Sequence, residues 1–228
     1  SLAVGGAWLV SQAGGFRGET NRGLTTYWRT LIVEGFYPML GEVATFIAFR
    51  LDRIVLAVAV GAEALGLYVV ALTIPGTLRI LPKAFCQVIA DRGRSGLEPA
   101  AAIMRHSRRF LAGYFLALGA ATVAGWVLLP VVFSEGFRNA RDVLVVVTIA
   151  EAILSVHLIY QALLVGFTGP RAIGLPQVVG GLVTVALTMV MIPRWGLHGA
   201  AVACASGYAV LAVTSGIWTT RELKKVGA

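Results

Sequence analysis

The sequence predicts an all-α, polytopic transmembrane helical bundle, with about six membrane-spanning helices preceded by the remnant of another helix. Hydrophobic residues make up 57% of the chain and charged residues only 13%, whereas a soluble domain averages about 25% charged residues. The apolar residues gather in long runs, each able to cross about 30 Å of hydrocarbon as a helix. Because these runs are continuous and do not alternate with polar residues, a transmembrane β-barrel is rejected.

Three regions are expected along the chain. Residues 1–35 hold a short apolar stretch, 2–13, which we interpret as the end of a preceding transmembrane helix, and a polar loop. Residues 36–220 hold a six-helix transmembrane lobe, and residues 221–228 form a basic tail.

Six apolar segments follow one another in this lobe. Their expected ranges are 36–60, 65–90, 110–133, 143–167, 172–192 and 199–218. Pro75, Pro82 and Pro176 lie inside spans, where membrane helices tolerate proline and usually kink, which serves either packing or gating. Gly180, Gly181 and the small residues of 199–207 predict close approach between helix backbones.

The distribution of cations predicts the orientation. If the loop at 17–29 is cytoplasmic, twelve basic residues fall on the cytoplasmic side and three, Arg138, Arg141 and Arg194, on the other. The twelve are Arg17, Arg22, Arg29, Arg92, Arg94, Arg105, Arg108, Arg109, Arg171, Arg221, Lys224 and Lys225. This positive-inside bias places the C-terminus in the cytoplasm. It also accounts for the net charge of +8 without nucleic acid, since nothing in the chain resembles a groove-reading helix or an aromatic RNA platform.

Four further cations, Arg50, Arg53, Arg79 and Lys83, lie inside the spans. A charge near the bilayer centre costs at least about 2.5–3.5 kcal/mol, so such residues usually face a water-filled cavity or a partner. Arg79 and Lys83 are four residues apart and share a helix face. Lys83 is close enough to the cytoplasmic end of its span to snorkel towards water.

A polar stripe is expected along the first span. At helical periodicity Glu42, Arg50 and Arg53 fall on one side, with Asp52 on its flank. Intramembrane cations suit a polyanion such as a pyrophosphate, which arginine grips with paired hydrogen bonds. The alternative is an internal ion pair of Arg50 or Arg53 with Asp52 or a neighbouring acid.

Other candidate groups are few. Glu151 and His157 in the fourth span are candidates for ion coupling, although their helical offset does not place them in one site. Cys86 and Cys204 lie in apolar segments without metal-ligand spacing. No catalytic motif is present, so we expect a protein that is not an enzyme and uses neither a metal nor a cofactor.

Two stretches carry a family resemblance. The segment 49–56 (FRLDRIVL), Gly61 and the segment 65–71 (LGLYVVA) resemble the start of the second half of polysaccharide flippases in the multidrug/oligosaccharidyl-lipid/polysaccharide exporter superfamily. Pro176 and the segment 192–203 (IPRWGLHGAAVA) are similar to a hairpin near the end of that family. Together the matches bracket nearly all of the lobe.

The resemblance implies the second lobe of a MATE-like fold, in which two six-helix lobes surround a central cavity. It implies transport of undecaprenyl-pyrophosphate-linked oligosaccharide across the bacterial inner membrane, by alternating access, for surface polysaccharide biosynthesis. The implied partners are this lipid-linked substrate, membrane lipids and an N-terminal lobe absent from the chain. Arg50, Arg53 and Arg79 would then take the part of cations lining the cavity.

Several other functions stay open. A cation-coupled multidrug extruder of the same superfamily would favour an acidic cavity, and a peptidoglycan-precursor flippase is a further close relative. A membrane-embedded glycan polymerase, ligase or acyltransferase should carry a large outer loop or an intramembrane His/Asp pair, and the sequence shows neither. A scaffold without transport activity would tolerate changes at Arg50 and Arg53.

Overall fold

The computed structural model describes residues 21–96, 98–133, 136–137, 140–169 and 174–226. All regular structure in these residues is helical, which confirms the predicted all-α class. The chain divides into two compact units, residues 1–36 and 37–228. The predicted helix end at 2–13 and Arg17 lie outside the described residues. The sections below concern the second unit.

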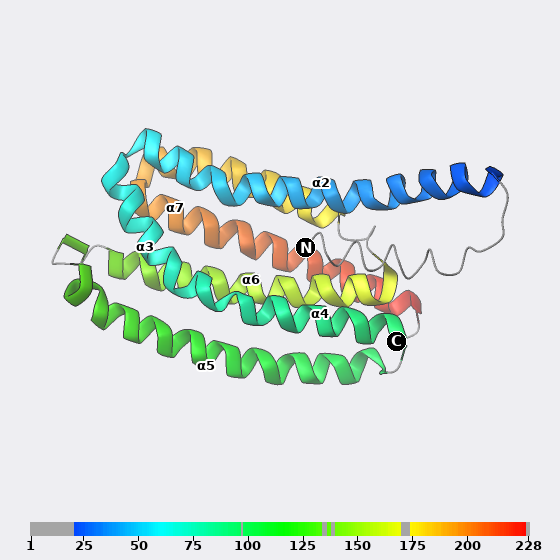
Figure 1. The fold of residues 1–228 in the computed structure, drawn as a ribbon. Helices are drawn as coiled ribbons and strands as arrows, with labels where there is room; N and C mark the ends of the chain where they lie inside the picture. The colour runs from blue at the N-terminus through cyan, green and yellow to red at the C-terminus, as the bar shows by residue number, and fades with distance from the viewer. Residues whose placement is uncertain (1–20, 97, 134–135, 138–139, 170–173, 227–228) are drawn as a thin grey trace. The chain divides into compact units, whose positions relative to one another are not determined.

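Six helices are assigned in the described residues (Figure 1). They are α2 (Asn21–Ala59), α3 (Ala62–Leu78), α4 (Ile80–Ser95), α5 (Ala100–Phe133), α6 (Ala140–Thr168) and α7 (Gly174–Val226). Within the described part of the chain, four stretches are long and apolar enough to cross a membrane: Ala62–Ser95, Ala100–Val132, Ala140–Thr168 and Pro176–Leu223. The chain is therefore a membrane-embedded, multi-pass helical protein.

The second predicted span consists of two helices joined at Arg79. The Arg79 amide donates to the Gly76 carbonyl at 3.3 Å, a tighter turn than an α-helix makes. Pro82 explains this change, because it lacks the N–H that would bond the Leu78 carbonyl. Pro176 stands in the first turn of α7, as Pro82 stands in the first turn of α4, and there a missing N–H leaves no bond of that helix unmade.

Helix α7 contains a break at Gly196, inside the turn predicted at 193–198. Gly196 has φ 56° and ψ −128°, a conformation that suits glycine because a Cβ would be strained there. A Cβ on Gly180 would meet Leu211, and one on Gly207 would meet Thr184. The members of each pair lie about equally far on either side of Gly196. The two halves of α7 therefore run antiparallel in close contact, as the small residues predicted.

Helix α6 is the centre of the bundle. It contacts α3, α4, α5 and α7. Half of its most apolar 18 residues are buried, whereas only 22% of the corresponding residues are buried in Ala62–Ser95 and 17% in Ala100–Val132. The largest core cluster joins α6 residues to α2, α3, α5 and α7, with Leu56, Tyr68, Leu129, Leu144 and Ala200 fully or almost fully buried. The polar residues described below lie between these packed helices.

Candidate functional site

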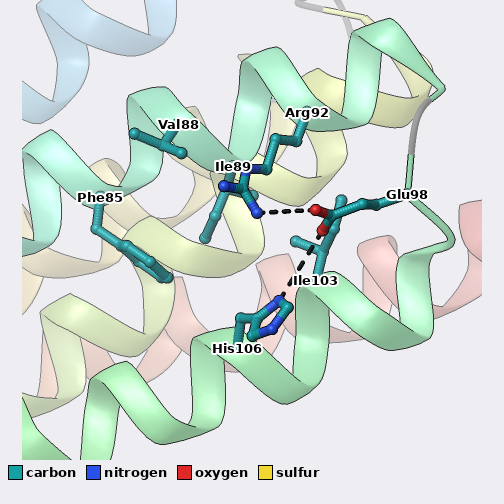
Figure 2. Close-up of a pocket in the computed structure, with 7 residues that line it drawn as sticks. All are labelled: Phe85, Val88, Ile89, Arg92, Glu98, Ile103 and His106. Atoms are coloured by element: carbon teal, nitrogen blue, oxygen red, sulfur yellow. Dashed lines mark hydrogen bonds and ion pairs between the residues drawn. The ribbon is translucent and has the colours of Figure 1, made fainter.

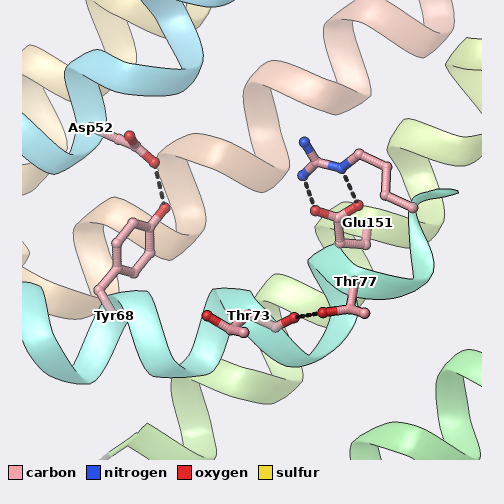
Figure 3. A network of polar contacts seen from close by, with 6 residues as sticks. Asp52, Tyr68, Thr73, Thr77 and Glu151 are labelled. Atoms are coloured by element: carbon pink, nitrogen blue, oxygen red, sulfur yellow. Dashed lines mark hydrogen bonds and ion pairs between the residues drawn. The ribbon is translucent and has the colours of Figure 1, made fainter.

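A buried ion pair joins Arg79 to Glu151 of α6. Arg79 Nε donates to Glu151 Oε2 at 2.9 Å, and Arg79 Nη2 donates to Glu151 Oε1 (Figure 3). The Glu151 side chain is 1% exposed and the Arg79 side chain 22%. Two parallel charge-assisted bonds of this kind are strong and fix the orientation of both groups. The break between α3 and α4 is thus tied to the central helix.

Arg79 also contacts an aromatic residue of α2. Its guanidinium lies 5.7 Å from the centre of the Phe49 ring of α2, a distance typical of a cation–π contact. Phe49 in turn packs edge-on against Tyr208 of α7, with ring centres 5.0 Å apart. One side chain therefore links the α3–α4 junction to α6 and to two further helices.

Asp52 is buried and bonds to Tyr68. The Tyr68 hydroxyl donates to Asp52 Oδ2 at 2.8 Å (Figure 3), and the Arg53 amide donates to Asp52 Oδ1 at 2.7 Å. Among the described residues, Asp52 forms no ion pair with Arg50 or Arg53. The structure therefore turns Asp52 away from the predicted polar stripe and into the core.

The rest of the predicted stripe lies at or near the surface of α2. Glu42 and Arg50 are exposed, and Arg53 is half-buried. The Arg50 guanidinium lies 5.6 Å from the centre of the Phe46 ring. Arg53 Nε is buried and has no hydrogen-bond partner among the residues that the structure describes. Arg50 and Arg53 thus remain without an acidic partner within 4 Å in the described part of the chain.

His157 belongs to a separate contact between α6 and α7. Its Nδ1 lies 2.9 Å from Ser215 Oγ and 3.2 Å from the Leu211 carbonyl oxygen. The Leu211 carbonyl can only accept, so that bond requires a proton on Nδ1. Glu151 and His157 have different partners on different helices, in agreement with their predicted helical offset. Whether either couples ions stays a prediction.

Sequence reasoning missed several polar partners. The contacts of Tyr68 and Ser215, and a hydrogen bond of 2.8 Å between the Thr122 and Thr148 hydroxyls, depend on helix packing that has no local signal. Thr73 and Thr77, by contrast, bond to carbonyls of their own helix (Figure 3). Lys83 follows Arg79 by one helical turn, and its amide donates to the Arg79 carbonyl at 3.3 Å. Its side chain is exposed.

The described residues contain no group of three or more His, Cys, Asp or Glu side chains able to hold a metal. Cys86 and Cys204 are free thiols. Paired side chains of different helices lie in the interior of the bundle, whereas Arg50 and Arg53 lie at or near the surface of α2 without an acidic partner among the described residues.

Comparisons with known proteins give no match. No protein-family model, no curated protein and no solved structure matches the chain. Any functional assignment therefore has to be argued from the residues themselves.

Proposed function

We propose that this chain is one lobe of an oligosaccharide-lipid flippase of the multidrug/oligosaccharidyl-lipid/polysaccharide exporter superfamily. It moves undecaprenyl-pyrophosphate-linked oligosaccharide across the bacterial inner membrane by alternating access, as a transporter and not an enzyme. The observation that carries the proposal is the exposure of Arg50 among exposed apolar side chains of α2. The resemblance of residues 49–71 and 192–203 supports the choice of family.

Arg50 stands among exposed apolar side chains. Val43, Phe46, Ile47 and Ile54 of the same helix are all exposed. If α2 crosses the membrane, an arginine on its lipid-facing surface near the bilayer centre costs at least about 2.5–3.5 kcal/mol. The face is therefore better explained as the wall of a hydrated cavity opposite a partner lobe.

The charges of this face suit a pyrophosphate. Among the described residues, Arg50 has no acidic partner within 4 Å and Arg53 Nε has no acceptor. Phosphate oxygens would supply acceptors to both guanidinium groups, with the bidentate geometry that arginine favours. Arg79 is neutralised by Glu151, so we assign the initial capture of the anion to Arg50 and Arg53. Contacts of the substrate with Arg79, Asp52 and Glu42 stay predictions.

The acidic residues favour a flippase over a cation-coupled extruder. An extruder for organic cations needs a carboxylate that is free to meet its substrate. Asp52 is bonded to Tyr68, and Glu151 is bonded to Arg79. Glu42 is exposed on α2, but it shares this helix with two unpaired cations.

The proposal also includes six crossings. Division of α7 at Gly196 turns the four candidate stretches into five crossings. If α2 also spans the membrane, the number is six. With α3 and α4 counted as one crossing, consecutive crossings alternate in direction (Figure 1). The ends of α4, α6 and α7 then lie on the side where α5 begins. That side carries Arg92, Arg94, Arg105, Arg108, Arg109 and Arg221, against Arg141 and Arg194 on the other. The positive-inside rule then puts the C-terminus in the cytoplasm.

The decisive experiment compares polyprenyl-linked sugars in a strain lacking the full reading frame with those in the parent strain. We expect complete oligosaccharide to accumulate on its carrier in the cytoplasmic leaflet. Truncated sugars, or complete chains already outside, would contradict transport and indicate an enzyme of the same pathway. No change at all would contradict a role in glycan export.

Complementation then tests the two arginines. The double substitution Arg50→Ala and Arg53→Ala should abolish surface glycan while the protein still reaches the membrane. Arg194→Ala, an exposed arginine of the turn in α7, is the matched control and should restore glycan. Normal glycan in the double variant would remove the cationic cavity from the proposal.

A further inference from the structure

A groove between α4 and α5 lies apart from the polar interior. It encloses about 390 Å³, a volume within the usual range of small-molecule sites. Its floor is apolar and consists of Phe85, Val88 and Ile89 of α4 and Ile103 of α5 (Figure 2). Such a floor accommodates a hydrocarbon chain.

Charged and polar side chains close one end of this groove. Arg92 donates to Glu98 Oε1 at 2.8 Å, and His106 Nδ1 lies 3.9 Å from Glu98 Oε2 (Figure 2). Arg92 and His106 are each about half exposed, so both can meet a ligand from outside the groove. The groove thus has an apolar length and a polar end, as an amphiphile requires.

The polar end carries an excess of positive charge. Both acids of this region are already paired, Asp91 with Arg94 at 3.6 Å and Glu98 with Arg92. Three exposed arginines at the start of α5 have no acidic partner within 4 Å among the described residues: Arg105, Arg108 and Arg109. Arg109 follows His106 by three residues, so the two are neighbours on the helix surface.

We propose that this groove binds an anionic phospholipid, with one acyl chain along Phe85, Val88, Ile89 and Ile103 and the headgroup phosphate between Arg92, His106 and Arg109. Basic pockets between membrane helices near the headgroup region are a known way to recognise anionic lipids. Free phosphate would leave the apolar floor uncovered, and a neutral lipid would leave the arginines unpaired. The site requires a membrane-embedded chain and does not depend on the flippase proposal.

The test measures lipid binding to the purified chain in a neutral detergent. Thermal unfolding and native mass spectrometry are recorded with added phosphatidylglycerol, phosphatidylcholine or inorganic phosphate. Phosphatidylglycerol should raise the melting temperature and remain bound, whereas the other two should do neither. Equal effects of phosphatidylcholine would overturn the proposal in favour of a purely apolar contact, and equal effects of phosphate would overturn the role of the acyl chain.

Substitutions locate the site. Val88→Trp fills the groove from a position that is 48% exposed and should abolish the effect of phosphatidylglycerol, whereas Val123→Trp, at a 66% exposed position of α5, should not. Arg109→Gln should weaken binding about fivefold, as expected for the loss of one cation near a lipid headgroup, with Arg194→Gln as the control.

Glu98→Gln keeps the shape of the groove and removes its negative charge. We expect this variant to bind phosphatidylglycerol more tightly than the parent chain does. A purely structural contribution of Glu98 would not strengthen binding, so unchanged or weaker binding in a folded Glu98→Gln protein would overturn the proposal. These experiments measure lipid binding alone. A failure of the lipid-site proposal can therefore be told apart from a failure of the proposed glycan export.

Discussion

Arg79 and Glu151, 72 residues apart in the sequence, form a paired ion bridge at the point where α3 ends and α4 begins. The bridge lies at an interruption of a membrane-spanning stretch, where two prolines weaken the backbone hydrogen bonding. The bonds between Arg79 and Glu151 thus hold the junction of α3 and α4 against α6, at a point where backbone hydrogen bonds are missing. We infer that Arg79 is primarily a structural cation.

Removing one partner of this pair should destabilise the protein strongly. Glu151→Gln leaves the Arg79 charge without compensation, and breaking a buried pair in this way costs about 3–5 kcal/mol. Because the Arg79 side chain is 22% exposed, we expect the lower end of that range. Denaturant unfolding in detergent measures the change in the free energy of unfolding.

Two further variants make the test of the ion pair specific. Asp142→Asn removes an exposed acid from the first turn of the same helix and should change the free energy of unfolding by less than about 1 kcal/mol. The double variant Arg79→Met and Glu151→Met should recover most of the loss, because an apolar pair leaves no unpaired charge. A Glu151→Gln protein as stable as the Asp142→Asn protein would refute the importance of the bridge.

Tyr68→Phe tests the second buried contact. The change removes the donor to Asp52 Oδ2 and leaves a buried carboxylate short of one hydrogen bond, at a cost of about 1–3 kcal/mol. Tyr160→Phe is the control, since Tyr160 is a partly buried tyrosine of α6 outside this contact. The same unfolding experiment applies, and equal stability of the two variants would count against a stabilising role for the Asp52–Tyr68 bond.

Much of the fold follows from the sequence because the bilayer constrains it strongly. Long apolar runs must form helices there, since no water is present to satisfy exposed backbone groups. The turn at 193–198 is marked by Pro193 and Gly196, and the small residues around it predict close approach between helix backbones. These features depend on local composition, which a single sequence displays directly.

The pairing of charges could not be predicted in the same way. In a membrane helix that is apolar all round, hydrophobic periodicity does not show which face meets the core. The sequence therefore predicts Asp52 on the flank of the arginine stripe, whereas the structure buries it against Tyr68. Arg79 and Glu151 were considered as separate candidates because only the packing of α6 against α3 and α4 brings them together.

Gly196→Ala tests the break in α7. With φ 56° at this position, a side chain is strained by about 1–3 kcal/mol, and the hairpin should lose that much stability. Gly119→Ala in α5 is the control, because a Cβ there meets nothing within 4 Å and alanine is the better helix former. The two substitutions should thus change the melting temperature in opposite directions, and a shift in the same direction would contradict the assigned turn.

Water access to position 50 distinguishes two interpretations of the exposed surface of α2, as the wall of a hydrated cavity or as a lipid-facing surface. In a chain whose Cys86 and Cys204 are replaced by alanine, a single Arg50→Cys substitution should react with a charged thiol reagent, because thiols ionise and react in water. Leu116→Cys provides the control, since Leu116 is 76% exposed on the apolar surface of α5 and should stay unreactive in lipid. Both variants are labelled in intact membranes with the full reading frame present, so that the proposed partner lobe covers its face. If position 50 resisted labelling as position 116 does, the exposed arginine of α2 would not face water, and the main support for a cationic transport cavity would be lost.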